Sequence, residues 1–220
     1  MKEVAIYSVI YLALFGFTEL LYHKFKVNAE YTRKIVHICT GLIALTFQVY
    51  LDETWQVAFL TLSFLGLIAL SEKKKWFKSI TAINRKSSGS WLFALVVLFC
   101  FWLSKEWTLE FYYLPILILS ISDPMAALVG KKTRFYPIKI FGQLKTIGGT
   151  IAFFITTVAL IFGFKMIAPF IFDGLTFSSY TWFFIIQLAL VSSFAELFST
   201  KGWDNFTVPV SIIIVLFCYN

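Results

Sequence analysis

Long apolar runs separated by short polar gaps dominate the chain. Eight such runs can be drawn, at about residues 4–22, 35–51, 54–71, 89–104, 109–122, 148–172, 178–199 and 206–219. A helix needs about 20 mostly apolar residues to cross a bilayer. The fifth run reaches that length only if its helix starts near Trp107 or continues past Asp123. The pattern predicts an all-α, polytopic transmembrane bundle of seven to eight helices, with residues 1–220 as a single integral membrane domain.

The composition agrees with a chain that lies in a bilayer. Hydrophobic residues make up 59% of the sequence and aromatic residues 20%, whereas soluble domains are about 45–50% apolar. The net charge of +7 would favour nucleic acid in a soluble protein. In a membrane protein, an excess of basic residues in the cytoplasmic loops explains this net charge, so we expect no nucleic-acid partner. Cys39, Cys100 and Cys218 lie inside apolar runs without metal-ligand spacing, so we expect them to be packing residues.

The basic residues divide unevenly between the two sides of the predicted bundle. Of the 19 Lys and Arg residues, 16 fall in alternate gaps, near residues 23–34, 72–88, 123–147 and 200–205. Cytoplasmic loops carry the excess of Lys and Arg in membrane proteins. The pattern therefore predicts a multi-pass protein of the plasma or inner membrane with these gaps in the cytoplasm and both termini outside.

The polar residues that could carry chemistry come from five separated segments. The segments are "TRKIVHICTG", "NRKSSGSW", "ISDPMAALVGKK", "LKTIGGT" and "AELFSTKGWDNFTVP". All five lie on the predicted cytoplasmic side or just inside it. In the first, Arg33 and His37 are four residues apart and so share one helical face. Either Arg33 reaches the headgroups while His37 bonds within the bundle, or both donate to phosphate oxygens.

Asp123 stands at the end of an apolar run, where a carboxylate is costly unless it is paired, metal-bound or hydrated. One interpretation is a structural turn, because helices often end at Asp-Pro. The other is a site, because Ala126 and Gly130 are small enough for a ligand or a helix to approach and Lys131 adds a cation.

The last two segments combine anion-binding and cation-binding residue types. Consecutive glycines at a helix amino end favour anions, and Lys145 would add a positive charge for phosphates. Glu196, Asp204 and Asn205 offer the oxygen ligands that Mg²⁺ prefers. The alternatives are a basic loop end before a helix and a solvated turn after Gly202. Taken together, the five segments predict phosphoryl or nucleotidyl transfer to a lipid at the bilayer boundary.

Four of these motifs together resemble the CTP-dependent polyprenol kinases, which include phytol kinase, dolichol kinase and the CTP-using diacylglycerol kinase. They are "RKIVH", "SDPMAALVGKK", "KTIGGT" and "ELFSTKGWDNFTVP", and the resemblance covers roughly residues 30 to 212. It implies a membrane-embedded helical bundle, CTP as phosphoryl donor, Mg²⁺ as cofactor and a lipid alcohol as acceptor. The family is also similar to phosphatidate cytidylyltransferase. Gly148 departs from the pattern, because it stands where the family usually carries an acidic residue.

The residues and the resemblance together predict a CTP-dependent kinase of a polyprenol, phytol or diacylglycerol. Catalytic roles are assigned to Asp123, Lys145, Asp204 and His37. Mg²⁺ binding is assigned to Asp123, Glu196 and Asp204. Substrate and nucleotide binding is assigned to Arg33, Lys34, Arg85, Gly130, Lys131, Thr146, Gly149 and Asn205.

Three other functions stay open at this point. The first is a phosphatidate cytidylyltransferase that makes CDP-diacylglycerol from CTP and phosphatidate. The second is a small transporter, which midplane charges and inverted repeats would favour, although the sequence shows neither. The third is a scaffold without activity, for which Gly148 is the argument. The acceptor lipid and the formation of a homodimer are left open.

Overall fold

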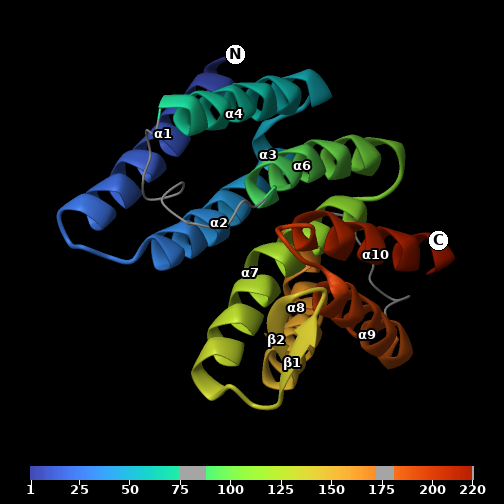
Figure 1. The fold of residues 1–220 in the computed structure, drawn as a ribbon. Helices are drawn as coiled ribbons and strands as arrows, with labels where there is room; N and C mark the ends of the chain where they lie inside the picture. Colours follow the sequence, from blue (N-terminus) through green and yellow to red (C-terminus); the bar gives the residue numbers. More distant parts are fainter. Residues whose placement is uncertain (75–87, 172–180, 220) are drawn as a thin grey trace. The chain divides into compact units, whose positions relative to one another are not determined.

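The computed structural model describes residues 1–74, 88–171 and 181–219, and within them helices dominate (Figure 1). The chain divides into two compact units, Met1–Tyr112 and Tyr113–Asn220. The boundary falls within helix α7 (Glu110–Thr133). Each unit is described by itself, and the assignment of residues 1–220 to one membrane domain stays a prediction.

Five helices belong to the described part of the first unit. They are α1 (Lys2–His23), α2 (Ala29–Leu45), α3 (Phe47–Tyr50), α4 (Thr54–Lys74) and α6 (Gly89–Glu106). Helix α1 packs on α2 and α4, and α4 packs on α6. The Tyr112 hydroxyl donates to the Ala44 carbonyl at 2.6 Å and so ties the start of α7 to α2. Its ring meets the buried Phe101 edge-on, which fixes an aromatic core at this point.

Helix α2 starts well before the apolar run that predicts it. Its first residue is Ala29, and the Asn28 side chain accepts a hydrogen bond from the Glu30 amide at 2.9 Å. An Asn at this position satisfies one of the unpaired amides of the first turn and so defines the start of the helix. Arg33, Lys34 and His37 therefore lie inside the helix instead of opening it.

The second unit contains the rest of α7, a two-stranded hairpin and three further described helices. The elements after α7 are β1 (Pro137–Ile140), β2 (Gln143–Thr146), α8 (Ile147–Ile171), α9 (Trp182–Phe198) and α10 (Asp204–Tyr219). Helix α9 packs on both α8 and α10. Inside the unit, the Thr157 hydroxyl of α8 donates to the Ser122 hydroxyl of α7 at 3.0 Å, and both side chains are fully buried.

Helix α7 continues through Asp123 and Pro124 to Thr133. The expectation that the fifth apolar run extends past Asp123 is confirmed, and the alternative of a helix end at Asp-Pro is wrong. Proline inside a helix removes one backbone hydrogen bond. Neighbouring helices and Ser side chains make such a residue tolerable in apolar helices, and α7 carries the buried Ser120 and Ser122 just before Pro124.

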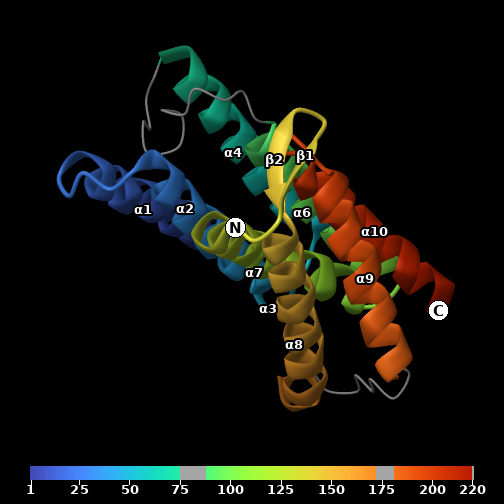
Figure 2. The ribbon, with the colours of Figure 1, turned by 60° about the horizontal axis from the view of Figure 1, so that its bottom comes forward.

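The antiparallel hairpin β1–β2 was not expected from the sequence. Ile140 pairs with Gln143, so Phe141 and Gly142 form a two-residue loop. Both have positive φ, 46° and 80°, as a type I′ turn requires. The hairpin follows α7 after three residues and leads into α8 without a linker, and in Figure 2 it lies beside the ends of α8 and α9.

The described part of each predicted apolar run is mainly helical, and the run 35–51 is divided between α2 and α3, so the all-α fold is confirmed. In the described part of the chain, five helices are long and apolar enough to cross a membrane: α1, α4, α6, α7 and α8. Helices α9 and α10 are apolar but shorter, with 17 and 16 residues. The chain is a helical membrane protein, whereas the number of crossings and the side that each loop faces stay predictions.

Candidate functional site

Lys145 and Glu196 form the centre of the candidate site, in the second unit. The Lys145 ammonium forms an ion pair with the Glu196 carboxylate and also donates to the Glu196 backbone carbonyl at 2.8 Å. Lys145 lies in β2 and Glu196 in the last turn of α9. Glu196 is only 5% exposed, so the pair is largely removed from water, where a carboxylate needs a cation nearby.

Asp204 brings a second carboxylate to this place. A tight turn joins α9 to α10, and Lys201 and Gly202 within it have φ values of 56° and 90°. The turn returns the chain so that the charge of Asp204 acts on Glu196. Across the same turn, the Ser199 and Thr207 hydroxyls form a hydrogen bond with each other. A second carboxylate close to the Lys145–Glu196 pair favours the binding of a further cation.

Asn205 supplies an oxygen without a partner beside these carboxylates. Its side-chain amide donates to the Gly202 carbonyl at 3.2 Å and to an Asp204 carboxylate oxygen at 3.1 Å. Its carbonyl oxygen Oδ1 is buried and accepts no hydrogen bond from any of the described residues. Buried acceptors without a partner are rare in proteins. The Asp204–Asn205 pair therefore fits a divalent cation that binds oxygen ligands.

A complete protein-only metal cage is not present. Within residues 1–74, 88–171 and 181–219, no three His, Cys, Asp or Glu side chains gather closely enough to hold a metal ion. Binding of Mg²⁺ by Asp123, Glu196 and Asp204 stays a prediction. Mg²⁺ at nucleotide sites usually binds one or two carboxylates together with the phosphates, and Glu196 and Asp204 are enough for that arrangement.

The amino end of α8 does not offer its amides to an anion. The Ile147 and Gly148 amides donate to the carbonyls of Tyr136 and Phe135 at 3.1 and 3.3 Å. The Gly149 amide donates to the Thr146 hydroxyl at 3.0 Å, which caps the helix. The expectation that the glycines of "KTIGGT" hold phosphate through these amides is not supported by this geometry. Contact between a nucleotide and Thr146 or Gly149 stays a prediction.

Gly130 and Gly149 have a clear packing role where α7 meets α8. A Cβ atom on Gly149 would lie 2.9 Å from the Ala126 carbonyl oxygen and 3.5 Å from the Gly130 Cα. A Cβ on Gly130 would lie 2.6 Å from the Thr146 hydroxyl oxygen. Small residues let two helices approach to backbone contact. These two glycines therefore let α7 and α8 approach each other closely.

Gly148 faces the end of α7. A Cβ there would lie 2.9 Å from the Thr133 hydroxyl oxygen and 3.2 Å from the Phe135 Cβ. An acidic side chain at this position would meet both residues as soon as it left the backbone. Thr133 and Phe135 occupy the space beside Gly148, so an acidic side chain there would require them to shift.

Asp123 and Lys131 lie on α7, which packs against α8 in this unit. Asp123 is half-buried and lies one turn before Ala126, which borders Gly149. Lys131 is exposed and directly follows Gly130. Both belong to the same unit as Lys145, Glu196 and Asp204.

The remaining candidates lie elsewhere in the chain. Arg33, Lys34 and His37 belong to the first unit and are half-buried. The His37 ring packs on the Phe93 ring of α6, with 4.9 Å between the ring centres. Arg85 lies outside the described residues. The roles of these four residues stay predictions.

Comparison with known proteins adds independent information on the family. The chain is 28% identical to phytol kinase from Synechocystis sp. over 217 residues, which is 94% of this chain and 88% of that protein. The chain is therefore similar to a phytol kinase along nearly its whole length. The predicted resemblance to the polyprenol and phytol kinases is thereby confirmed over nearly the whole chain. No family model and no solved structure matches the chain.

Sequence reasoning named Lys145 and Glu196 as candidates but did not predict their contact with each other. It assigned Lys145 to phosphate and Glu196 to metal, whereas the structure pairs them with each other. The two are 51 residues apart, and nothing in the local pattern of either one indicates the other. The Ser199–Thr207 pair was also missed. Its signal was available, because both hydroxyl residues lie within the motif "ELFSTKGWDNFTVP".

Proposed function

We propose that the protein is a CTP-dependent kinase of a lipid alcohol that acts at the cytoplasmic membrane face. The observation that carries the proposal is the grouping of Lys145, Glu196 and Asp204, completed by the Asn205 oxygen that has no partner. The similarity to a phytol kinase over 94% of the chain supports a lipid alcohol as acceptor. A prenyl alcohol such as phytol is the first candidate.

Lys145 has the donor that the reaction needs. An ammonium group has three N–H donors, and in the described residues Lys145 uses two of them on Glu196. The third can bind a phosphate oxygen of CTP while Glu196 keeps the ammonium in place. Stabilising charge at a fixed position is the main way in which proteins accelerate phosphoryl transfer.

Asp123 is the proposed general base. The oxygen of the lipid hydroxyl forms a bond to the γ-phosphorus as the bond between that phosphorus and the bridging oxygen of CDP breaks. The hydroxyl proton passes to the Asp123 carboxylate, and CDP leaves. A half-buried carboxylate on an apolar helix suits this role because the substrate approaches from the lipid side.

Mg²⁺ is the proposed cofactor, with Asp204, Asn205 and Glu196 as the residues that would hold it. When bound, the ion neutralises phosphate charge and orients the triphosphate. Asp204 presents one carboxylate oxygen to the Asn205 amide, which keeps its side chain ordered at the start of α10.

The position of the label on CTP tests the reaction. Purified protein in detergent receives CTP labelled at the γ- or the α-phosphorus, Mg²⁺, and phytol, a polyprenol, diacylglycerol or phosphatidate. A kinase transfers label to the lipid only from γ-labelled CTP. Label from α-labelled CTP on phosphatidate would instead establish the cytidylyltransferase. Label on no lipid, together with no binding of CTP and Mg²⁺, would favour an inactive scaffold.

A further inference from the structure

The hairpin Pro137–Thr146 has two faces of different character. Ile138 and Lys145 are cross-strand partners on one face, and Lys139 and Leu144 are partners on the other. Lys145 binds Glu196, so its face points into the second unit. The opposite face is open, because Lys139 is exposed and Leu144 is 75% exposed.

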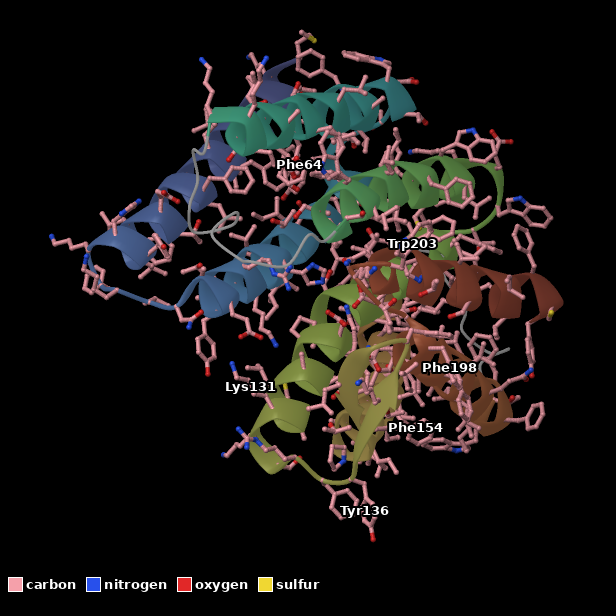
Figure 3. All side chains as sticks on the ribbon, viewed as in Figure 1. Phe64, Lys131, Tyr136, Phe154, Phe198 and Trp203 are labelled. Atoms are coloured by element: carbon pink, nitrogen blue, oxygen red, sulfur yellow. The ribbon has the colours of Figure 1, made fainter. Side chains whose placement is uncertain are left out.

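Aromatic side chains extend this open face at both ends of the hairpin. Phe141 at the turn is 76% exposed, and Tyr136 before β1 is 67% exposed. In Figure 3 the Tyr136 ring points away from the ribbon. Phe141 also adopts a positive φ, which Asn, Asp or Gly adopts more easily. Phe141 therefore presents a large apolar surface that is suited to contact with an apolar partner.

Positive charge surrounds the same segment. The exposed basic residues are Lys131, Lys132, Arg134 and Lys139, and the hairpin Pro137–Thr146 and the turn before it contain no acidic residue. Basic residues next to exposed aromatic and aliphatic side chains are typical of segments that lie at an anionic lipid surface.

The covalent connection places the hairpin at membrane level. It is joined to α7 and α8, both long and apolar enough to cross a bilayer, and β2 ends at Thr146 where α8 begins at Ile147. A strand of four residues is about 13 Å long. The turn at Phe141 therefore lies within about 13 Å of the amino end of α8. This distance is within the thickness of the headgroup layer.

We propose that the open face of the hairpin docks on the anionic lipid surface of the membrane. Phe141 and Leu144 enter the boundary between headgroups and acyl chains, while Lys139 and Arg134 meet lipid phosphates. The docking holds Lys145, on the opposite face of the same strand, at a fixed depth beside the bilayer. This inference depends on the chain being a membrane protein and not on its reaction.

Photocrosslinking tests the contact directly. The full chain carries p-benzoylphenylalanine in place of Phe141 and is reconstituted into vesicles of phosphatidylcholine alone or of phosphatidylcholine with phosphatidylglycerol. Mass spectrometry then counts lipid adducts. We expect adducts at Phe141, with a higher yield in the anionic vesicles. The change Lys139→Glu should lower that yield by up to about fivefold in anionic vesicles and leave it unchanged in neutral ones.

Two control positions make a negative result meaningful. The same photoprobe in place of Ile155, exposed on the apolar helix α8, should give lipid adducts in both vesicle types with equal yield. The probe in place of Ile138, on the inner face, should give adducts with protein instead. Three results would each overturn the proposal. The first is lipid adducts at Ile155 without any at Phe141, and the second is an equal yield at Phe141 in both vesicle types. The third is adducts from Phe141 to a second copy of the chain.

Discussion

The Lys145 ammonium holds Glu196 at two points, the side-chain carboxylate and the backbone carbonyl in the last turn of α9. The Lys145 side chain therefore joins the hairpin to the end of α9, next to the turn that leads into α10. Because Glu196 is buried, this contact has a structural role as well as the proposed catalytic one. The two roles can be separated by experiment.

Replacing Lys145 with Met should destabilise the second unit. The change leaves the buried Glu196 carboxylate without its cation, and the loss of one partner from a buried pair costs about 3 kcal/mol. The double variant Lys145→Met with Glu196→Gln should recover much of this loss, because no buried charge remains. Thermal unfolding in detergent measures both variants.

The matched control for this pair is Lys139→Met, which changes an exposed lysine on the other face of the hairpin and should leave the melting temperature unchanged. Phosphoryl transfer should be lost in both Lys145 variants, including the restabilised one. Full activity in the double variant would show that Lys145 has no catalytic role.

Gly149→Ala should destabilise the contact between α7 and α8. The added methyl group would lie 2.9 Å from the Ala126 carbonyl oxygen, a backbone atom that can move only with its helix. Overpacking of this kind costs about 1–3 kcal/mol. The control is Gly163→Ala in the same helix, where no described atom outside the adjoining helix backbone lies within 4 Å of the added methyl group.

The control variant should be neutral or stabilised by up to about 1 kcal/mol, because alanine favours a helix more than glycine does. Chemical unfolding of both variants in mixed micelles compares the two changes. An equal response of Gly149→Ala and Gly163→Ala would mean that α7 and α8 do not meet at Gly149.

Gly148→Ala should be destabilising for a different reason. Its methyl group would meet the Thr133 hydroxyl at 2.9 Å and the Phe135 Cβ at 3.2 Å. Adding Thr133→Ala removes one of the two obstacles, so the double variant should be more stable than Gly148→Ala alone. The difference in melting temperature between the two variants measures this. If both melt alike, the Thr133 hydroxyl is not an obstacle to a side chain at Gly148.

The helices were predictable because burial in a bilayer requires a long apolar segment, and the described part of each apolar run is mainly helical. The residues at which the helices begin and end were less predictable. Helix α2 starts at Ala29 and α7 continues to Thr133 because polar residues are tolerated in a helix when a cap or a neighbouring helix supports them. Apolar content alone cannot show this support.

The hairpin was missed although its signal is present. The segment "PIKIFGQLKT" alternates apolar and polar residues on both sides of Phe141-Gly142, the pattern of two strands and a short turn. The pairing of Lys145 with Glu196 was beyond sequence reasoning. It depends on the register of the hairpin and on the end of α9, two features that are set 51 residues apart.

Asp204→Asn should weaken the use of Mg²⁺ while it preserves the fold. The amide can still accept from the Asn205 backbone amide through its oxygen, as the carboxylate does at 3.0 Å. The second oxygen and its charge are lost, so the Mg²⁺ concentration for half-maximal activity should rise by about tenfold or more. Titration of activity with Mg²⁺ measures the shift, and an unchanged titration would remove Asp204 from the metal site.

Asp123→Asn should abolish transfer without unfolding the protein. An amide has nearly the shape of the carboxylate, but it cannot accept the proton of the lipid hydroxyl, and loss of a general base lowers turnover by about 100-fold or more. Binding of CTP should persist, because the proposed contacts of the nucleotide with Lys145 and Asp204 remain. The matched control, Asp52→Asn, removes an exposed carboxylate between α3 and α4 and should retain full turnover. Turnover by Asp123→Asn equal to that of the control would show that the proton leaves by another route, and His37 would then be the next residue to replace.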